Sequence, residues 1–234
     1  MTESTYQVVQ FIHPGFEYPL APNGPGLMPW KDGRAIHNRK FMLSRGSYVD
    51  RNGRDNRSEP VVFWGEWEGP SVYWPVSSHG KPLPSVVHAP FRPQRWPERS
   101  VQNTDPVVFA DGFIYSNCMQ PAFPSLQSLT PGSIVLFGRY GRDPQGHSFG
   151  LDTCLVIESR EPTLPGGEGW GEDLLSDAVL RPLSSEGAVQ HFAVYTGRVG
   201  PAEPFSFVPA LPATAQLPLF ARRCSRRWAT WRGS

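Results

Sequence analysis

Short apolar runs, rich in β-branched and aromatic residues, recur along the chain and are separated by turn residues. Runs of this kind are typical of β-strands. They predict strands over 6–12, 61–67, 72–76, 107–109, 113–115, 134–137, 151–157, 192–195 and 205–208. The pair Asp111-Gly112 stands between two of these runs and predicts a tight hairpin turn. Further turns are predicted at Asn52-Gly53, Pro131-Gly132, Gly166-Gly167 and Gly200-Pro201.

Helical periodicity is weak. Residues 172–180 begin with acidic residues and are followed by Arg181-Pro182, a pattern typical of a short helix, and a second short helix is expected over 125–129. The chain holds 26 prolines, which argues against a helix bundle because an interior proline costs a helix ~3 kcal/mol. We therefore expect a mainly β (α+β) fold: an antiparallel, β-barrel-like single domain with one or two short helices.

The whole chain, 1–234, is expected to form this one domain, because no repeat and no linker interrupts it. Hydrophobic residues make up 39% and aromatic residues 12% of the sequence, which is enough for a sizeable core and excludes wholesale disorder. Two proline-rich stretches, 14–36 and 79–102, are predicted to be long loops. The C-terminal tail, 222–234, is basic and carries Trp228 and Trp231.

Targeting and metal-binding signals are not found. The sequence lacks a signal-peptide pattern and an apolar run of the ~20 residues that span a bilayer, so we expect a cytoplasmic protein with no membrane association. Three widely spaced cysteines argue against a disulfide framework. Six histidines form no close pairs, and no phosphate-binding loop is present, so no metal and no cofactor are predicted.

The strand predicted over 61–67 carries the clearest candidate chemistry. Side chains alternate across a strand, so Trp64, Glu66 and Glu68 fall on one face, and Gly65 leaves room for a ligand. Two carboxylates about 7 Å apart raise the pKa of one of them, which suits general acid–base catalysis. The alternative is an edge strand with a solvated acidic face.

Basic residues gather between positions 37 and 48. Arg39, Lys40 and Arg45, with His37 and Tyr48 nearby, predict a basic turn that binds a phosphorylated or nucleobase-bearing ligand. The alternative is a solvated basic turn, which would form ion pairs with the two glutamates.

Two further candidates are isolated residues. His13 stands at the end of the first predicted strand, where it could act as an acid or base; the alternative is a structural histidine. Cys118 follows the predicted hairpin, so it could be a nucleophile activated by a histidine such as His191; a buried, inert cysteine is the alternative. Asp111 and Asn117 flank the same segment as candidate ligand-binding residues.

Residues 126–137 read LQSLTPGSIVLF and are followed by the apolar run 151–157. This pattern resembles the core of PUA-like domains of the ASCH and EVE type, in which a short helix and a tight turn open a barrel strand. Gly132 suits the third position of such a turn, which takes a positive φ. The resemblance covers 126–157 and implies an RNA or modified-base ligand. The whole chain also resembles uncharacterised bacterial proteins encoded near DNA-modification systems.

Together these features predict a protein directed at a nucleotide or nucleic acid, which binds and could modify a base in an aromatic, acidic and basic cleft. The net charge of +1 favours a nucleotide, a single strand or a flipped base over a long duplex. Two alternatives remain: a small-molecule enzyme that uses paired carboxylates or a Cys/His pair, and a protein-interaction scaffold. The sequence does not decide whether a reaction is catalysed, and it leaves the oligomeric state undetermined.

Overall fold

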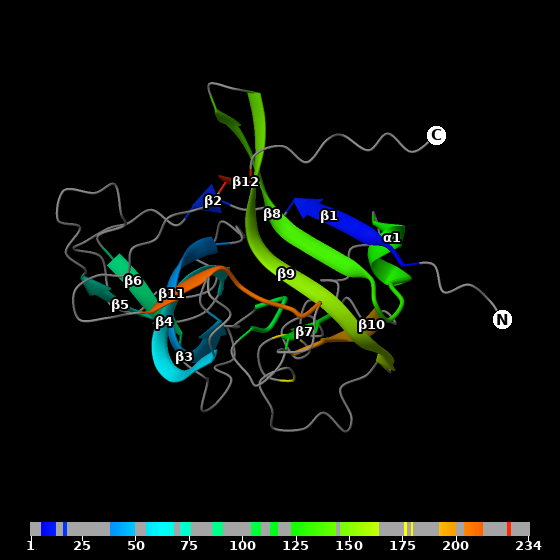
Figure 1. The fold of residues 1–234 in the computed structure, drawn as a ribbon, viewed down its shortest axis with the longest axis horizontal. Helices are drawn as coiled ribbons and strands as arrows, with labels where there is room; N and C mark the ends of the chain where they lie inside the picture. Colours follow the sequence, from blue (N-terminus) through cyan, green and yellow to red (C-terminus); the bar gives the residue numbers. More distant parts are fainter. Residues whose placement is uncertain are drawn as a thin grey trace, which may run out of the picture.

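The computed structural model describes the chain mainly as β-strands, which confirms the mainly β fold (Figure 1). The described residues are 6–12, 16–17, 38–49, 55–67, 71–75, 86–90, 104–108, 113–116, 123–143, 146–163, 176, 179, 192–199, 204–212 and 224–225. Their strands form two mixed sheets.

The first sheet contains six described strands: β1 (Val8–Ile12), β7 (Phe113–Tyr115), β8 (Ile134–Asp143), β9 (Gly146–Thr163), β10 (Phe192–Gly197) and β12 (Cys224–Ser225). Its order is β1-β8-β9-β10-β7, and β12 pairs with β9. Only β1 runs parallel to its neighbour among these pairs, with Val8 opposite Ile134. The predicted strands 6–12, 134–137, 151–157 and 192–195 all belong to this sheet.

The second sheet contains β2 (Phe16–Glu17), β3 (Asn38–Val49), β4 (Asp55–Glu66), β5 (Ser71–Pro75), β6 (Val86–Pro90) and β11 (Ala210–Pro212). Its order is β11-β4-β3-β6-β5, and β2 pairs with β3. Strands β2 and β6 both run parallel to β3.

Neither sheet closes into a barrel among the described strands, so the expectation of an antiparallel barrel is corrected to two open, mixed sheets. A barrel needs hydrogen bonds between its first and last strands, and in the described part of the chain the terminal strands β1 and β7 of the first sheet do not pair with each other. Turn residues in the sequence reveal antiparallel neighbours, because a short turn can join them. The strands of a parallel pair are distant in the chain, so no such turn marks them.

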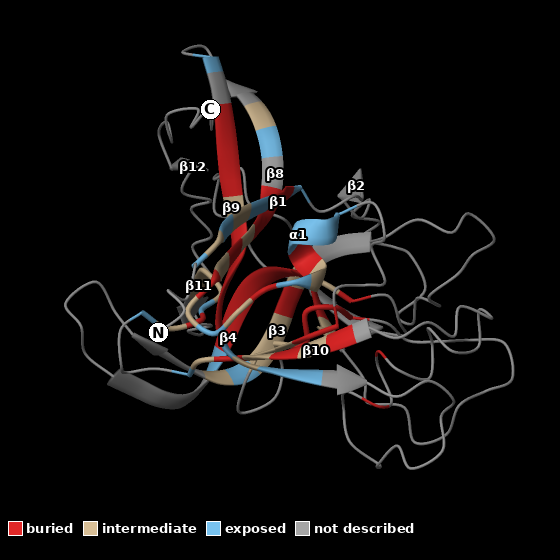
Figure 2. Ribbon diagram, turned by 90° about the vertical axis from the view of Figure 1, so that its right-hand side faces the viewer, coloured by how far each residue is buried: buried red, intermediate tan, exposed pale blue. Residues whose placement is uncertain are grey.

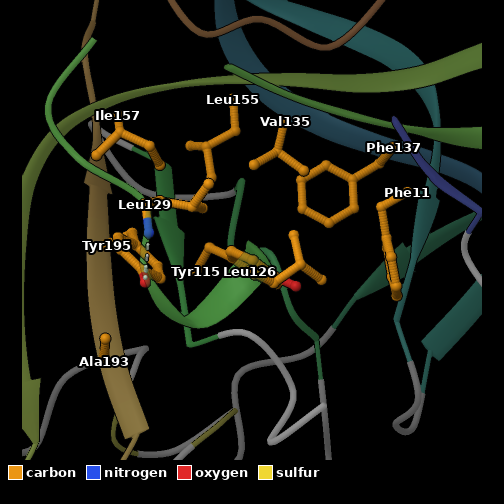
Figure 3. Close-up of a cluster of buried hydrophobic side chains, with 10 residues drawn as sticks. All are labelled: Phe11, Tyr115, Leu126, Leu129, Val135, Phe137, Leu155, Ile157, Ala193 and Tyr195. Carbon is orange, nitrogen blue, oxygen red and sulfur yellow. Dashed lines mark hydrogen bonds between the residues drawn. The ribbon is translucent and has the colours of Figure 1, made fainter. Parts of the chain in front are cut away.

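The first core cluster lies between the first sheet and helix α1 (Pro124–Gln127), which confirms the short helix expected there (Figure 3). The Tyr195 hydroxyl accepts a hydrogen bond from the Leu129 backbone N–H at 3.3 Å, so it fixes the chain just after the helix. The cluster consists of Phe11, Tyr115, Leu126, Leu129, Val135, Phe137, Leu155, Ile157, Ala193 and Tyr195.

The turn after α1 has the geometry that its sequence predicts. The Ser133 N–H donates to the Thr130 carbonyl at 2.9 Å, and Gly132 has φ +89°. A non-glycine residue is strained at this φ, and a Cβ on Gly132 would also overlap the ring of Tyr6. Strand β8 begins directly after this turn.

A second core cluster belongs to the other sheet and consists of Met42, Val61, Phe63, Trp67, Val107 and Val179. Val107 exchanges two backbone hydrogen bonds with Ile114, which lies on β7 of the first sheet. Phe207 likewise pairs with Cys154 of β9 just before the chain enters β11. These two bridges hold the sheets together, and Figure 2 shows the buried residues where the two sheets meet.

Three elements fall where the sequence indicated loops or turns. The predicted basic turn is the twelve-residue strand β3, the predicted loop 79–102 contains β6, and 14–36 contains β2. The remainder of both stretches lies outside the described residues, as does the tail 222–234 apart from β12. Of the helix predicted over 172–180, only Ser176 and Val179 are described, and both are helical and buried. No helix in the described part of the chain is long and apolar enough to cross a membrane.

Candidate ligand-binding face of strands β3 and β4

The candidate residues on β3 and β4 are brought together by the register of this antiparallel pair. Arg39 lies opposite Glu66, Phe41 opposite Trp64, and Arg45 opposite Pro60. Residues directly opposite each other share a face of the sheet, as do residues two apart on one strand. Positions 39, 41 and 45 of β3 therefore share one face with positions 64 and 66 of β4. We call this the Arg39–Glu66 face.

The opposite face of the same pair is the second core. Met42, Phe63 and Trp67 are all at most 4% exposed. A Cβ on Gly65 would stand 2.9 Å from the Phe63 ring and 3.7 Å from Met42. The room above Gly65 is thus filled by core side chains, which corrects the expectation that a ligand approaches there. Lys40 pairs with Gly65 and so belongs to this second face by register.

Trp64 is buried on the Arg39–Glu66 face, with only 6% of its surface exposed. Its ring meets Phe41 edge to face, with centroids 4.5 Å apart and planes at 62°. Trp64 therefore presents little surface to a ligand, and its ring supports the ring of Phe41. Phe41 is half-buried and is the aromatic residue of this pair that retains solvent-accessible surface.

Glu66 is the last residue of β4 and is half-buried. The Thr104 hydroxyl donates to the Glu66 backbone carbonyl at 2.8 Å, and Thr104 itself is fully buried. A buried partner at this point holds the end of β4 in place. The carboxylate of Glu66 is therefore presented from a fixed strand end rather than from a loop.

A buried acid that the sequence reading did not single out stands directly after Thr104. Asp105 is 2% exposed and accepts two hydrogen bonds from Ser116, one from the backbone N–H and one from the hydroxyl, both at 2.8 Å. In sequence, Thr104-Asp105-Pro106 has only the pattern of a turn. An aspartate in a turn that precedes an apolar run is a common signal, so nothing marked this one as buried.

The basic residues do not all converge on Glu66. Arg45 is exposed and lies six residues from Arg39 along β3, roughly 20 Å at the usual rise per residue. Tyr48 pairs with Asn56 beyond an irregularity in the register, near the other end of the hairpin. The structure therefore brings Arg39 and Phe41 to the Glu66 end and leaves Arg45 and Tyr48 away from it.

Several predicted site residues lie outside the described part of the chain: His13, His37, Glu68, Asp111, Asn117 and Cys118. Cys154 is described and buried, and burial raises the pKa of its thiol to about 11, so it is not an activated nucleophile. Among the described residues, no group of three or more histidine, cysteine, aspartate or glutamate side chains could hold a metal ion.

Comparison of the chain with family models, with curated proteins and with solved structures gives no match.

Proposed function

We propose that this protein binds a nucleotide, or a flipped base of single-stranded nucleic acid, on the Arg39–Glu66 face. The observation that carries the proposal is the β3–β4 register, which puts a cationic, an aromatic and an acidic residue on neighbouring positions of one face. These are the three residue types that a nucleotide engages, through its phosphate, its base plane and its base edge.

Each residue then has a distinct role. Arg39 provides a guanidinium for phosphate oxygens, to which arginine binds in a bidentate manner. Phe41, steadied by Trp64, provides a ring for the base, and such stacking contributes ~1–3 kcal/mol. Glu66 accepts a hydrogen bond from an exocyclic amino group, as acidic side chains do with cytosine. A cytoplasmic location, where nucleotides and nucleic acid are abundant, belongs to the same proposal.

The resemblance of 126–157 to PUA-like domains supports this ligand class, because those domains recognise RNA and modified bases. It bears on the first sheet, whereas the Arg39–Glu66 face is on the second.

The alternative for the same residues is a surface ion pair between Arg39 and Glu66. Such pairs contribute only ~0–1 kcal/mol to stability, so stability alone does not separate the two roles. Nucleotide binding does separate the two roles, because an Arg39–Glu66 ion pair that takes no part in ligand binding has no effect on nucleotide affinity.

The test is calorimetric titration of the four nucleoside monophosphates and of a short single-stranded oligonucleotide into the wild-type chain and its variants. Arg39→Ala should weaken binding about tenfold or more, since hydrogen bonds to charged groups contribute about 1.5–3 kcal/mol. Glu66→Gln should change the preference among the bases. Both variants should keep a free energy of unfolding within ~1 kcal/mol of wild type.

Lys40→Ala is the matched control, because it removes one positive charge from the neighbouring position on the opposite face. Glu158→Gln is the control for the glutamate, because Glu158 is exposed on β9. Equal binding by Arg39→Ala and Lys40→Ala, or no binding of any nucleotide by the wild type, would overturn the proposal.

A further inference from the structure

Strand β1 forms one edge of the first sheet, and β8 is its only partner among the described strands (Figure 1). The Ile134 N–H donates to the Gln7 carbonyl at 2.8 Å, so the backbone groups of Gln7 point towards β8. These groups alternate in direction from one residue of a strand to the next, so residues 9 and 11 also face β8. The N–H and C=O groups of residues 8, 10 and 12 therefore point outward, away from the sheet.

The outward backbone groups of β1 form no hydrogen bond within the described part of the chain. The strand also lacks the features that usually protect an edge. Its sequence, VVQFI, contains no charged residue and no proline, and its register with β8 runs without a bulge. An unprotected edge of this kind is a template for pairing with another strand.

The side chains of β1 that point away from the core are exposed and mainly aliphatic. Val8 is 69% exposed and Ile12 is 44% exposed, whereas Phe11 is buried in the first core cluster. Gln10 lies between the two aliphatic residues on their face of the strand and is also exposed. The edge thus carries an aliphatic side chain near each end and an uncharged amide at its centre.

This arrangement is complementary to a second copy of itself. When two copies of β1 run antiparallel about a two-fold axis at Gln10, Val8 of each copy lies opposite Ile12 of the other. The two Gln10 residues then lie opposite each other. Residues 8, 10 and 12 have outward backbone groups, so all three become hydrogen-bonded positions of the new ladder. The exposed aliphatic side chains cover one another on both sides of the axis, and no charge is buried.

We propose that this protein forms a two-fold symmetric dimer through β1, in which the first sheets of two copies join into one continuous sheet. The interface is isologous, because the same edge serves both copies. Each copy uses its β1 edge once, so assembly through this edge ends at two chains. Val9 packs against the first core cluster and Phe11 belongs to it. Because Val9 of one copy lies opposite Phe11 of the other, the dimer extends this core across the axis.

The first test is sedimentation velocity over a wide range of protein concentration, in which the wild type should change from one chain to two as the concentration rises. Val8→Lys/Ile12→Lys places like charges opposite each other twice and should weaken the dimer about tenfold or more. Val199→Lys/Phe207→Lys is the matched control, because these residues are 50% and 40% exposed and lie outside β1. This control should dimerise as the wild type does.

A charge-swapped variant separates loss of pairing from loss of folding. In Val8→Lys/Ile12→Glu, the new lysine of each copy lies opposite the new glutamate of the other. This variant should therefore dimerise about tenfold or more tightly than the double-lysine variant. Far-UV circular dichroism checks that both variants are folded. Equal dimerisation of the two would contradict the antiparallel register.

Disulfide trapping tests the position of the axis in a background that carries Cys118→Ser and Cys224→Ser. Gln10→Cys should give a disulfide between two chains, because opposite residues of a hydrogen-bonded pair have Cα atoms ~5.5 Å apart. Val8→Cys is the control, since the two copies of residue 8 lie ~14 Å apart in this register and should stay unlinked. A non-reducing gel after mild oxidation distinguishes single chains from linked pairs.

A single chain at every concentration would overturn the proposal, because some other strand would then cover the edge. Assemblies larger than two chains, or disulfide formation by Val8→Cys as readily as by Gln10→Cys, would also overturn it. The dimer does not involve the Arg39–Glu66 face, so Arg39→Ala should dimerise as the wild type does. The double-lysine variant should likewise bind nucleoside monophosphates as the wild type does, which keeps the two proposals separately testable.

Discussion

Ser116 donates both its backbone N–H and its hydroxyl to the carboxylate of Asp105, and each hydrogen bond is 2.8 Å long. Because the neighbouring Thr104 bonds to the last carbonyl of β4, this short segment connects the end of the second sheet to the end of β7 in the first. The position of Glu66 thus depends on a buried acid that is distant from it in sequence.

Replacing Asp105 with alanine should lower the free energy of unfolding by about 2–4 kcal/mol, because two donors of Ser116 would lose a charged, buried acceptor. Urea denaturation monitored by tryptophan fluorescence measures the loss. Asp105→Asn keeps one acceptor oxygen for the backbone N–H and should lose clearly less. Equal losses in the two variants would show that these hydrogen bonds contribute little.

Gly138→Ala should destabilise the protein by about 3 kcal/mol or more, since its new Cβ would overlap the backbone carbonyl oxygen of Gly150. Gly141→Ala is a matched change on the same strand, where the Cβ would stand 2.9 Å from the movable Ser148 Oγ, and it should be much milder. Thermal melting compares the two. Removing the Phe149 ring should not rescue Gly138→Ala, because the conflict with the backbone oxygen remains; rescue would contradict this explanation.

Ser206→Ala should cost about 1–3 kcal/mol of stability. Its hydroxyl accepts from the Val156 N–H at 2.9 Å and lies 3.2 Å from the Val156 carbonyl, so it bonds to the backbone of β9 just beyond Ile157, the last residue that pairs with β10. In the Ser206→Ala variant, amide hydrogen exchange should be faster at Val156 than at its neighbours. Ser128→Ala is the control, since that exposed hydroxyl donates to the Pro124 carbonyl at the surface, and its effect should stay within ~0.5 kcal/mol.

Cys154 should react very slowly with a thiol reagent at neutral pH, because the thiolate is the reactive form and burial raises the pKa from 9.0 to about 11. The folded-state pKa lies above the unfolded value, so this residue leaves stability unchanged below pH 9 and lowers it as the pH rises from 9 towards 11. A variant with serine at positions 118 and 224 isolates the measurement. Rapid labelling of that folded variant at pH 7 would refute the assignment.

Local chemistry explains which elements the sequence predicts. Strands β1, β8 and β10 and helix α1 follow from apolar patterns bounded by turn residues, and the turn at Gly132 follows from Pro131-Gly132. These signals act within a few residues, so they need no knowledge of the tertiary fold.

The missed elements depend on distant partners. Strand β3 carries charged residues among its apolar positions, and it becomes a strand because β4, β2 and β6 all pair with it. The sequence singled out Arg39 and Glu66, but it could not give their register, because the register also depends on the pairing of distant segments. It likewise could not show that Lys40 belongs to the opposite face. The burial of Asp105 depends on Ser116, which a turn pattern does not reveal.

The parallel pairing of β1 with β8 joins two strands that are far apart in the chain. Gln7 reaches its partner Ser133 across 126 positions of the chain, which a ribosome takes roughly 6–25 s to add. During that interval β1 has left the ribosome without its neighbour, with its apolar residues available to chaperones or to other nascent chains. However fast the two strands pair, β1 cannot be joined to β8 before these later residues have been synthesised.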